Sequence, residues 1–422
     1  MTDTTNVVQF RQPDDVDDPL TEVLRAGARR LLAQAVELEA EAFLAARDDL
    51  RLPDGRSRLV RHGHGPERQV QTGIGPVPVS RVKIRDRGGA EEGERVRFSS
   101  AILPRWARRT KSLDALLPVL YLRGVSTGDF QEALTALLGK DAPNLSPAVV
   151  GRLTAEWQVE YEHWQARDLS ARRYVYVWAD GVYLQARMED HSECMLVLIG
   201  ATPEGRKELV GFQVGVRESA QSWRELLVEV KRRGLAIAPE IAVGDGALGF
   251  WKALDEVWPS TRHQRCWVHK IANVLNKVPK SVQPAIKADL REIYSAPERA
   301  AAEKAIAVFV EKYSAKYTKA VECLTKDRER LLTFFDFPAE HWDHLRTSNP
   351  IESVFATVRH RTVRTKGALS PKTARLMVFK LVIAASRKWR RLKGENQLPK
   401  VVAGVTFRDG TEVVDGQSTR AA

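Results

Sequence analysis

The stretch that decides the fold is YVYVWADGVYL, residues 174–184. β-Branched and aromatic residues dominate it, which predicts a buried strand. Asp180 places a carboxylate among large apolar neighbours, and burying a lone carboxylate is costly unless it gains a partner, a proton or a metal ion. The same residues also fit a hairpin whose two-residue loop is Asp180-Gly181. The stretch by itself leaves these two interpretations open.

The composition indicates a soluble protein with a polyanionic partner. At roughly 150 residues per domain, 422 residues suggest two or three domains. Lys and Arg number 66 against 54 Asp and Glu, a net charge of +12, which favours nucleic acid or an acidic membrane surface as partner. The three cysteines lack paired spacing, so we expect no disulfide framework and an intracellular location. No apolar run is long enough to span a bilayer, so we expect no membrane insertion.

The order of elements after residues 174–184 predicts a mixed sheet. Two further strands are predicted at Cys194–Ala201 and Lys207–Val216. A helix then starts at Ser222, where Ser222 and Glu225 fit a capping box, and two more strands are predicted at Ile241–Gly244 and Arg262–Cys266. Three antiparallel strands followed by alternating helix and strand is the order of an RNase H-like sheet. We therefore predict an α/β fold with an RNase H-like core formed by residues 171–266 and 346–393.

The N-terminal region is predicted to bind DNA. Residues 1–18 are acidic and polar and are expected to form a flexible tail. Residues 19–110 combine an amphipathic helix from Leu20 to about Ala46 with a strongly basic β-unit. Because residues 56–85 contain few acidic residues beside their many basic ones, we favour a surface that contacts phosphate over a solvated charged hairpin. The candidate DNA-binding residues here are Arg81, Lys83, Arg85, Arg108 and Arg109.

Three further segments complete the predicted organisation. Residues 111–170 suggest three helical pieces with the spacing of a helix-turn-helix unit, a pattern that many helical bundles share. Residues 267–345 are helical in pattern throughout and are predicted to form an all-α insertion in the core. Residues 394–422 lack periodicity and are expected to be a flexible C-terminal tail.

Three acids occupy positions that this sheet could bring together: Asp180, Asp245 and Glu352. The first and fourth strands are neighbours in such a sheet, and two adjacent carboxylates need cations to remain ionised. Two divalent ions about 3.5–4 Å apart would provide them and could support displacement at phosphorus. Taken singly, Asp245 also fits an Asx turn and Glu352 a capping box. Taken together, we interpret the three acids as catalytic.

Four motifs resemble those of the Mutator-type bacterial insertion-sequence transposases. They are WADGVY at 178–183, VGDGA at 243–247, CWVH at 266–269 and LRTSNPIES at 345–353. The resemblance extends from about residue 20 to about residue 395, and TSNPIE is its most specific piece. One departure is Pro350, where a small residue is more usual; Pro is acceptable as the first residue of a helix.

The resemblance implies a DDE transposase. Asp180, Asp245 and Glu352 would be catalytic and would bind two Mg²⁺ ions, which Mn²⁺ could replace. The implied reaction is cleavage at terminal inverted repeats followed by strand transfer to target DNA. The implied assembly is a homodimer or larger synaptic complex in the bacterial cytoplasm, associated with the nucleoid. The resemblance gives Cys266 and His269 a bracing role, and no second ligand pair follows that would complete a zinc site.

Arg359 follows Glu352 by seven residues, so the two lie on nearly the same helix face. We expect Arg359 to hold a phosphate near the scissile bond, although a solvated arginine is the alternative. Arg364 and Lys366 are further DNA-binding candidates. Two other functions stay open on the same fold: a non-catalytic DNA-binding regulator and a structure-specific nuclease.

Overall fold

The computed structural model describes residues 19–88, 95–123, 147–183, 193–246, 248–364 and 371–413. The chain divides into two compact units, Met1–Leu153 and Thr154–Ala422. The predicted flexible tail at residues 1–18 lies outside the described residues. Among the residues that are described, no helix is both long enough and apolar enough to cross a membrane.

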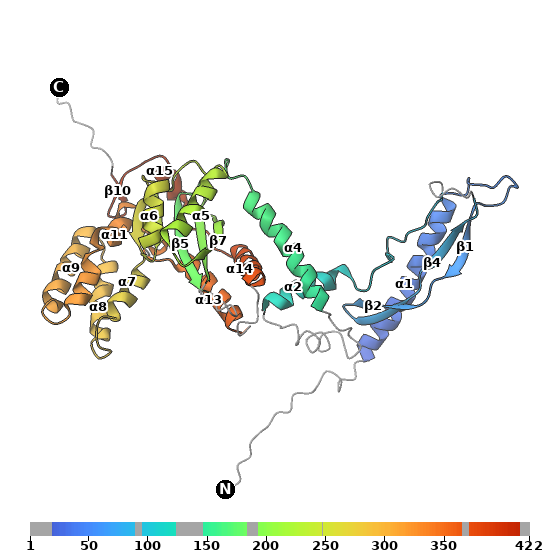
Figure 1. Ribbon diagram of the computed structural model, residues 1–422, viewed down its shortest axis with the longest axis horizontal. Helices are drawn as coiled ribbons and strands as arrows, with labels where there is room; N and C mark the ends of the chain where they lie inside the picture. Colours follow the sequence, from blue (N-terminus) through green and yellow to red (C-terminus); the bar gives the residue numbers. More distant parts are fainter. Residues whose placement is uncertain are drawn as a thin grey trace, which may run out of the picture. The chain divides into compact units, whose positions relative to one another are not determined.

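The described part of the first unit contains a long helix, a shorter helix and two short antiparallel sheets (Figure 1). Its elements are α1 (Pro19–Ala45), β1 (Leu59–His64), β2 (Arg68–Thr72), β3 (Gly75–Val79), β4 (Val82–Asp86) and α2 (Lys111–Arg123). β1 pairs with β4, and β2 pairs with β3. Val36 and Ala40 of α1 are buried against Val77 and Val79 of β3. The predicted helix and β-unit are thus present. The predicted apolar face of the helix covers the strands only in part, because Leu20, Val23, Leu24, Leu31 and Leu38 are exposed.

The second unit contains a five-stranded sheet in the order β7-β6-β5-β8-β9. Its strands are β5 (Tyr176–Tyr183), β6 (Glu193–Ala201), β7 (Lys207–Val216), β8 (Ile241–Gly244) and β9 (Arg262–Arg265). β5, β6 and β7 run antiparallel, whereas β8 and β9 continue parallel to β5. The predicted α/β architecture with a mixed sheet is confirmed. The hairpin interpretation of Asp180-Gly181 is wrong, because both residues pair with β6 in the body of β5.

Helices α5 (Ala220–Arg232) and α6 (Leu248–Val257) cover one face of this sheet. Their side chains pack in one core with Val177 and Ala179 of β5. Tyr176 and Trp178 alternate with these residues and therefore face the other side. There the indole N–H of Trp178 donates to the carbonyl of His344 at 2.9 Å. Asp180 shares this second face, which α13 (Asn349–Arg364) also approaches.

Helix α5 begins one turn earlier than the sequence predicts. Ser219 is the N-cap, and its hydroxyl accepts a hydrogen bond from the backbone N–H of Ser222 at 3.1 Å. Ser222 is therefore inside the helix, where it is buried. The capping-box pattern was displaced by three residues, because Ser219 and Ser222 both offer a cap side chain and only the tertiary turn after β7 selects between them.

The end of α4 (Pro147–Ala166) belongs to the second unit. Tyr161 stacks edge-on against Phe212 of β7 and Phe379 of α14 (Pro371–Ser386), with ring centroids 6.1 and 5.2 Å apart. The boundary between the two units, at residues 153 and 154, thus lies within α4 and differs from the predicted boundary at residue 170. α2 and α4 coincide with the first and third helical pieces of the predicted helix-turn-helix, and the middle piece lies outside the described residues.

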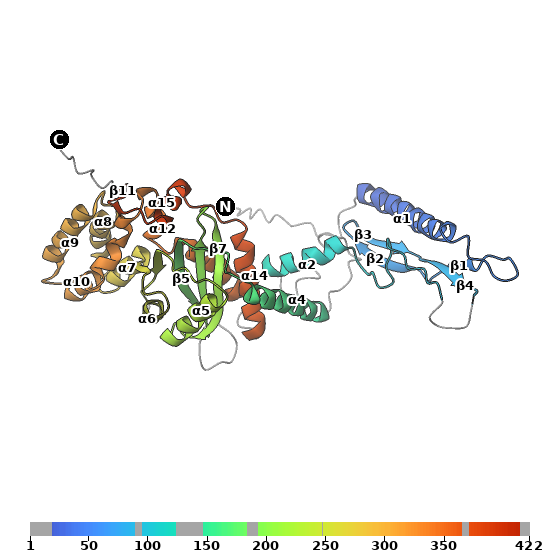
Figure 2. The same cartoon turned by 90° about the horizontal axis from the view of Figure 1, so that it is seen from above.

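Residues 267–345, all of which the structure describes, contain helices and no strand. They form α7 (Trp267–Leu275), α8 (Gln283–Tyr294), α9 (Arg299–Tyr313), α10 (Thr318–Thr325), α11 (Arg328–Leu332), η2 (Thr333–Asp336), η3 (Ala339–His341) and α12 (Trp342–Leu345). Figures 1 and 2 show α8 and α9 beside the sheet, on the side away from β7. The helices that the sequence predicts for this segment, called the insertion below, are thus present.

The predicted C-terminal tail is wrong for most of its length. Residues 395–412 form η4 (Glu395–Gln397), α15 (Leu398–Val402), β10 (Phe407–Arg408) and β11 (Thr411–Glu412). Gly410 accepts a hydrogen bond from the N–H of Ala339 and donates its own N–H to Phe335, each at 3.1 Å. These elements are too short to show periodicity, and contacts with the insertion hold them in place.

Candidate active site

Asp180 and Asp245 emerge at the same edge of two neighbouring strands. Ala179 of β5 pairs in parallel with Gly244 of β8, the last pair between these strands. Each acid follows the last paired residue by one position. Because adjacent strands lie about 4.8 Å apart, the two carboxylates are placed beside each other, as the sequence predicts.

The chain turns sharply directly after Asp245. Gly246 has a φ of +92°, a conformation that side chains disfavour, and a Cβ there would lie only 1.6 Å from Nη1 of Arg265. The guanidinium of Arg265 in turn donates to the carbonyl of Gly246 at 3.2 Å. Position 246 therefore accommodates only glycine, and the turn that places Asp245 depends on it.

Asp180 is almost completely buried, with 6% of its surface exposed. Its Oδ1 atom accepts a hydrogen bond from the backbone N–H of Gly181 at 2.8 Å. Burial, and then the negative charge of Asp245, raise the pKa of Asp180 to about 7, while His269 acts in the opposite direction. A carboxyl group in this state would be stabilised in its ionised form by a bound cation.

Glu218 joins the two aspartates, and the sequence analysis missed it. One carboxylate oxygen from each of Asp180, Glu218 and Asp245 lies within 4.8 Å of the others. Burial, followed by the charges of Asp245 and Asp180, raises the pKa of Glu218 to about 8. The sequence pattern that could have indicated Glu218 is an acidic residue between the predicted end of β7 and the predicted start of α5. That signal is weak, because acids are common before helices.

Glu352 belongs to a second cluster, with Cys266, Ser348 and His269. The N–H and the hydroxyl of Ser348 both lie 3.3 Å from Sγ of Cys266. The same hydroxyl lies 3.1 Å from Oε1 of Glu352, and Nδ1 of His269 lies 3.7 Å from that oxygen. The hydroxyl has one proton and can donate to only one of these acceptors at a time. The cluster joins the first turn of α7 to the first turn of α13.

His269 carries a positive charge at neutral pH. Its hydrogen bond with Cys266 raises the pKa of His269 to about 9 against the opposing effect of burial, and Asp180 and Asp245 add to the rise. Burial acts to raise the pKa of the Cys266 thiol, but its hydrogen bonds with His269 and Ser348 outweigh burial and lower it. The imidazolium thus places one cation beside a group of acids.

The predicted DNA-binding cations lie in both units. Arg359 is exposed on α13, two helical turns beyond Glu352. Arg364 is the last residue of α13, but its side chain, and Lys366 as a whole, lie outside the described residues. Arg85 and Arg108 are exposed, whereas Arg81, Lys83 and Arg109 are half-buried. Among the described residues of the first unit, Lys83 and Arg85 form no ion pair.

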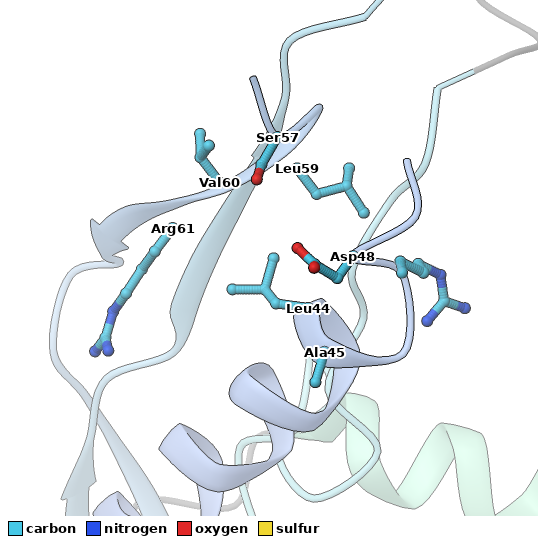
Figure 3. A pocket seen from close by; sticks show the side chains of 8 residues that line it. Leu44, Ala45, Asp48, Ser57, Leu59, Val60 and Arg61 are labelled. Atoms are coloured by element: carbon cyan, nitrogen blue, oxygen red, sulfur yellow. The ribbon is translucent and has the colours of Figure 1, made fainter. Parts of the chain in front are cut away.

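A separate cavity of about 320 Å³ lies in the first unit, between the end of α1 and β1 (Figure 3). It is lined by Leu44, Ala45, Arg47, Asp48, Ser57, Leu59, Val60 and Arg61. Asp48 is paired with Arg51, and Arg61 with Glu37. Two of the charged residues that line this cavity are thus held in ion pairs, and the carboxylates of the second unit remain the candidate active site.

Known proteins match the chain over most of its length. The family described as "Transposase, Mutator family" matches residues 1–391. The transposase for insertion sequence element IST2 of Acidithiobacillus ferrooxidans is 53% identical over 287 residues, 66% of this chain and 95% of that one. The transposase for insertion sequence element IS6120 of Mycolicibacterium smegmatis is 49% identical over 298 residues, 71% of this chain and 92% of that one.

A solved structure, the simian T-cell lymphotropic virus intasome in complex with PP2A regulatory subunit B56 gamma, is 11% identical and covers 37% of this chain and 49% of that chain. Its TM-score of 0.17 is too low to assign a common fold. The family match and the two bacterial relatives agree with the family resemblance of the sequence. The chain belongs to the Mutator family of transposases.

Proposed function

We propose that this transposase uses DDE chemistry: Mg²⁺-dependent cleavage at the terminal inverted repeats of an insertion sequence, followed by strand transfer to target DNA. The observation that carries the proposal is that Asp180, within β5, and Asp245, directly after β8, each follow the last parallel pair between these two strands. Glu352 acts electrostatically on the same buried carboxylate, Asp180. We further propose that the sheet and α13 form an RNase H-like core, because the strand order and the mixture of strand directions suit one.

The residues present fit hard divalent cations. Carboxylate oxygens are the ligands that Mg²⁺ and Mn²⁺ prefer. Oε2 of Glu218, in the same cluster, is buried without a hydrogen-bond partner among the described residues. Asp180, Asp245 and Glu352 would hold two ions, which would activate the attacking oxygen and stabilise the leaving oxygen. Mn²⁺ would serve in place of Mg²⁺.

The other residues of the site position these acids. The imidazolium of His269 and the hydroxyl of Ser348 would orient Glu352, and Cys266 would anchor Ser348. In the first step water attacks the phosphorus at the element end, and the bond from phosphorus to the 3′ oxygen of the element breaks. In the second step the freed 3′-hydroxyl attacks a target phosphodiester, one P–O bond forming as another breaks.

DNA would contact both units through their cations. Arg81, Lys83, Arg85, Arg108 and Arg109 would bind the terminal repeats, and Arg359, Arg364 and Lys366 would hold strands near the scissile bond. Such contacts are mainly to phosphate and would weaken with salt, with a log–log slope of about −0.9 per phosphate neutralised. Because two element ends must be joined together, we also propose a homodimer or larger assembly on DNA.

The test uses the full-length chain, Mg²⁺ and a supercoiled plasmid that carries both ends of the element. We expect cleaved ends with 3′-hydroxyls and products joined to target DNA, and none from Asp245→Asn. Circular and linear excised forms of the element would separate on the same gel. Cleavage without joining would indicate a nuclease, and repeat binding without cleavage would indicate a regulator; either result contradicts the proposal.

A further inference from the structure

We propose that Glu218 is a fourth metal-facing carboxylate, which shares one divalent cation with Asp180 and Asp245. This inference rests on the proposed function of the same site. The ligand atoms of Asp180, Glu218 and Asp245 form one group within 4.8 Å. Glu352 falls in the other group, with Cys266 and His269. In this arrangement Glu218 completes the oxygen set around one cation that the two aspartates share, and Glu352 would serve the second ion.

The fold leaves a place for the Glu218 carboxylate directly over β5. A Cβ at Gly181, the neighbour of Asp180, would lie 2.5 Å from Oε1 of Glu218 and 2.7 Å from Sγ of Cys194. Real Cβ atoms do not approach so closely, so the carboxylate occupies the space that a side chain at position 181 would fill. The absence of a side chain at this position lets Glu218 lie next to Asp180.

The backbone of Glu218 is also held. Its carbonyl oxygen lies 2.4 Å from where a Cβ on Gly249 of α6 would be. The preceding residue, Arg217, has a φ of +59°, which is uncommon for a residue other than glycine. The close contact with Gly249 and the unfavourable backbone conformation of Arg217 fix the orientation of the Glu218 backbone. Backbone strain of this kind is common at functional sites.

One carboxylate oxygen of Glu218 is buried without a partner that would explain its burial, as far as the described residues show. Its Oε2 atom is buried with no hydrogen-bond partner within the described part of the chain. It does not cap α5, because Ser219 does. A carboxylate oxygen that is buried and unsatisfied is unfavourable unless a ligand supplies the missing contact. A divalent cation between Glu218 and the two aspartates would supply it.

The test compares Glu218→Gln with Glu225→Gln in the full-length protein. Glu225 is a matched control, because it lies on α5 and its carboxylate bonds only to the amides of Gln213 and Gln221 among the described residues. Mn²⁺ binding is measured by calorimetry in the absence of DNA. We expect Glu218→Gln to weaken Mn²⁺ binding about tenfold or more and Glu225→Gln to match the wild type. Unchanged Mn²⁺ affinity in Glu218→Gln would overturn the inference.

Thermal unfolding provides a second readout. Without metal, Glu218→Gln should unfold at the same or a higher temperature than wild type, because it removes one of three crowded carboxylates. Mn²⁺ should then raise its unfolding temperature less than it raises that of wild type. Lower metal-free stability with an unchanged Mn²⁺ effect would contradict the inference and make Glu218 structural. If Glu218→Gln does not fold, Glu218→Asp, which keeps the charge but shortens the reach, replaces it with the same expectations for Mn²⁺.

The inference and the proposed function fail separately. If the wild type binds Mn²⁺ through Glu218 but neither cleaves nor joins DNA, the metal site stands and the proposed reaction is wrong. If the wild type cleaves and joins DNA while Glu218→Gln keeps full Mn²⁺ affinity, the reaction stands and the role of Glu218 is wrong.

Discussion

Nδ1 of His269 lies 3.7 Å from Oε1 of Glu352, although the helical insertion separates these residues in the chain. His269 is in the first turn of α7, which opens the insertion, and Glu352 is in the first turn of α13, which follows it. Ser348 bridges the two through Cys266 and Glu352. Both ends of the insertion thus meet at one cluster. A substitution in that cluster should therefore change the position or the pKa of the candidate active-site carboxylates.

Replacing His269 by Gln should raise the pH at which the enzyme becomes active. His269 lowers the pKa of Asp180, so its loss leaves that carboxyl protonated to higher pH. We expect DNA cleavage at pH 7 to fall by about tenfold or more and to recover partly at higher pH. The measurement is the pH dependence of cleavage. His263→Gln, which removes a histidine paired with Asp255, is the control. An unshifted pH profile in His269→Gln would leave His269 with a purely structural role.

Asp180→Asn, Asp245→Asn and Glu352→Gln should each abolish cleavage and spare DNA binding. The proposed reaction would need all three carboxylates to hold cations, whereas the proposed DNA contacts are made by Lys and Arg elsewhere. Cleavage assays, gel shifts and thermal unfolding are run on the same preparations. A variant that cleaves at the wild-type rate with matched metal would exclude its residue from the site.

Gly246→Ala should destabilise the protein and disable the site together. The new Cβ would meet the guanidinium of Arg265, and the φ of +92° disfavours a side chain in any case. We expect a loss of about 1–3 kcal/mol in the free energy of unfolding and a large loss of cleavage. Gly404→Ala is the control for strain alone, since Gly404 has a φ of +80° and nothing within 4 Å of its Cβ position. Equal effects of the two substitutions on cleavage would show that Gly246 does not position Asp245.

The metal-free protein should lose stability as pH rises from about 5 to 8. Folding raises the pKa of Asp180 to about 7 and that of Glu218 to about 8. Above their unfolded values of roughly 4, the folded chain binds more protons than the unfolded chain, so the free energy of unfolding falls with pH until both groups ionise. His269, with a pKa raised to about 9, acts in the same direction from about pH 6.5 upward.

Unfolding temperatures measured across this pH range test the effect. Saturating Mn²⁺ should flatten the pH dependence, because the cation replaces protons as the partner of the carboxylates. Asp180→Asn should flatten it as well, by removing one of the titrating groups. A stability that rises with pH between 5 and 8 would contradict the raised pKa values.

Arg359→Ala should reduce cleavage strongly, and Arg359→Lys should restore it only in part. Arg359 is exposed on α13, on nearly the same face as Glu352, where a guanidinium can grip a phosphate with two hydrogen bonds. Ala356, between them, is small and exposed and leaves room for a DNA strand. Rates are compared at low salt and saturating metal. Wild-type cleavage by Arg359→Ala would place this arginine among the solvated side chains.

Much of the architecture can be predicted from the sequence, because it depends on local patterns. β-Branched and aromatic runs predicted β5, β6 and β7, and helical periodicity predicted α1 and the insertion. Motifs such as TSNPIE indicated the family that the chain belongs to. Asp180 and Asp245 could be paired in advance, because the predicted sheet makes the first and fourth strands neighbours.

Other features depend on contacts between distant residues, and no local pattern encodes them. Glu218 reaches the aspartates because β7 returns beside β6 and because Gly181 leaves space for its carboxylate. Ser348 and Cys266 meet only when both ends of the insertion converge. The C-terminal elements are held by hydrogen bonds of Gly410 to Ala339 and Phe335. The sequence by itself determined most of the elements, the family and three of the four candidate acids. Only the tertiary structure decided which side chains lie together, since packing and burial are properties of the assembled fold.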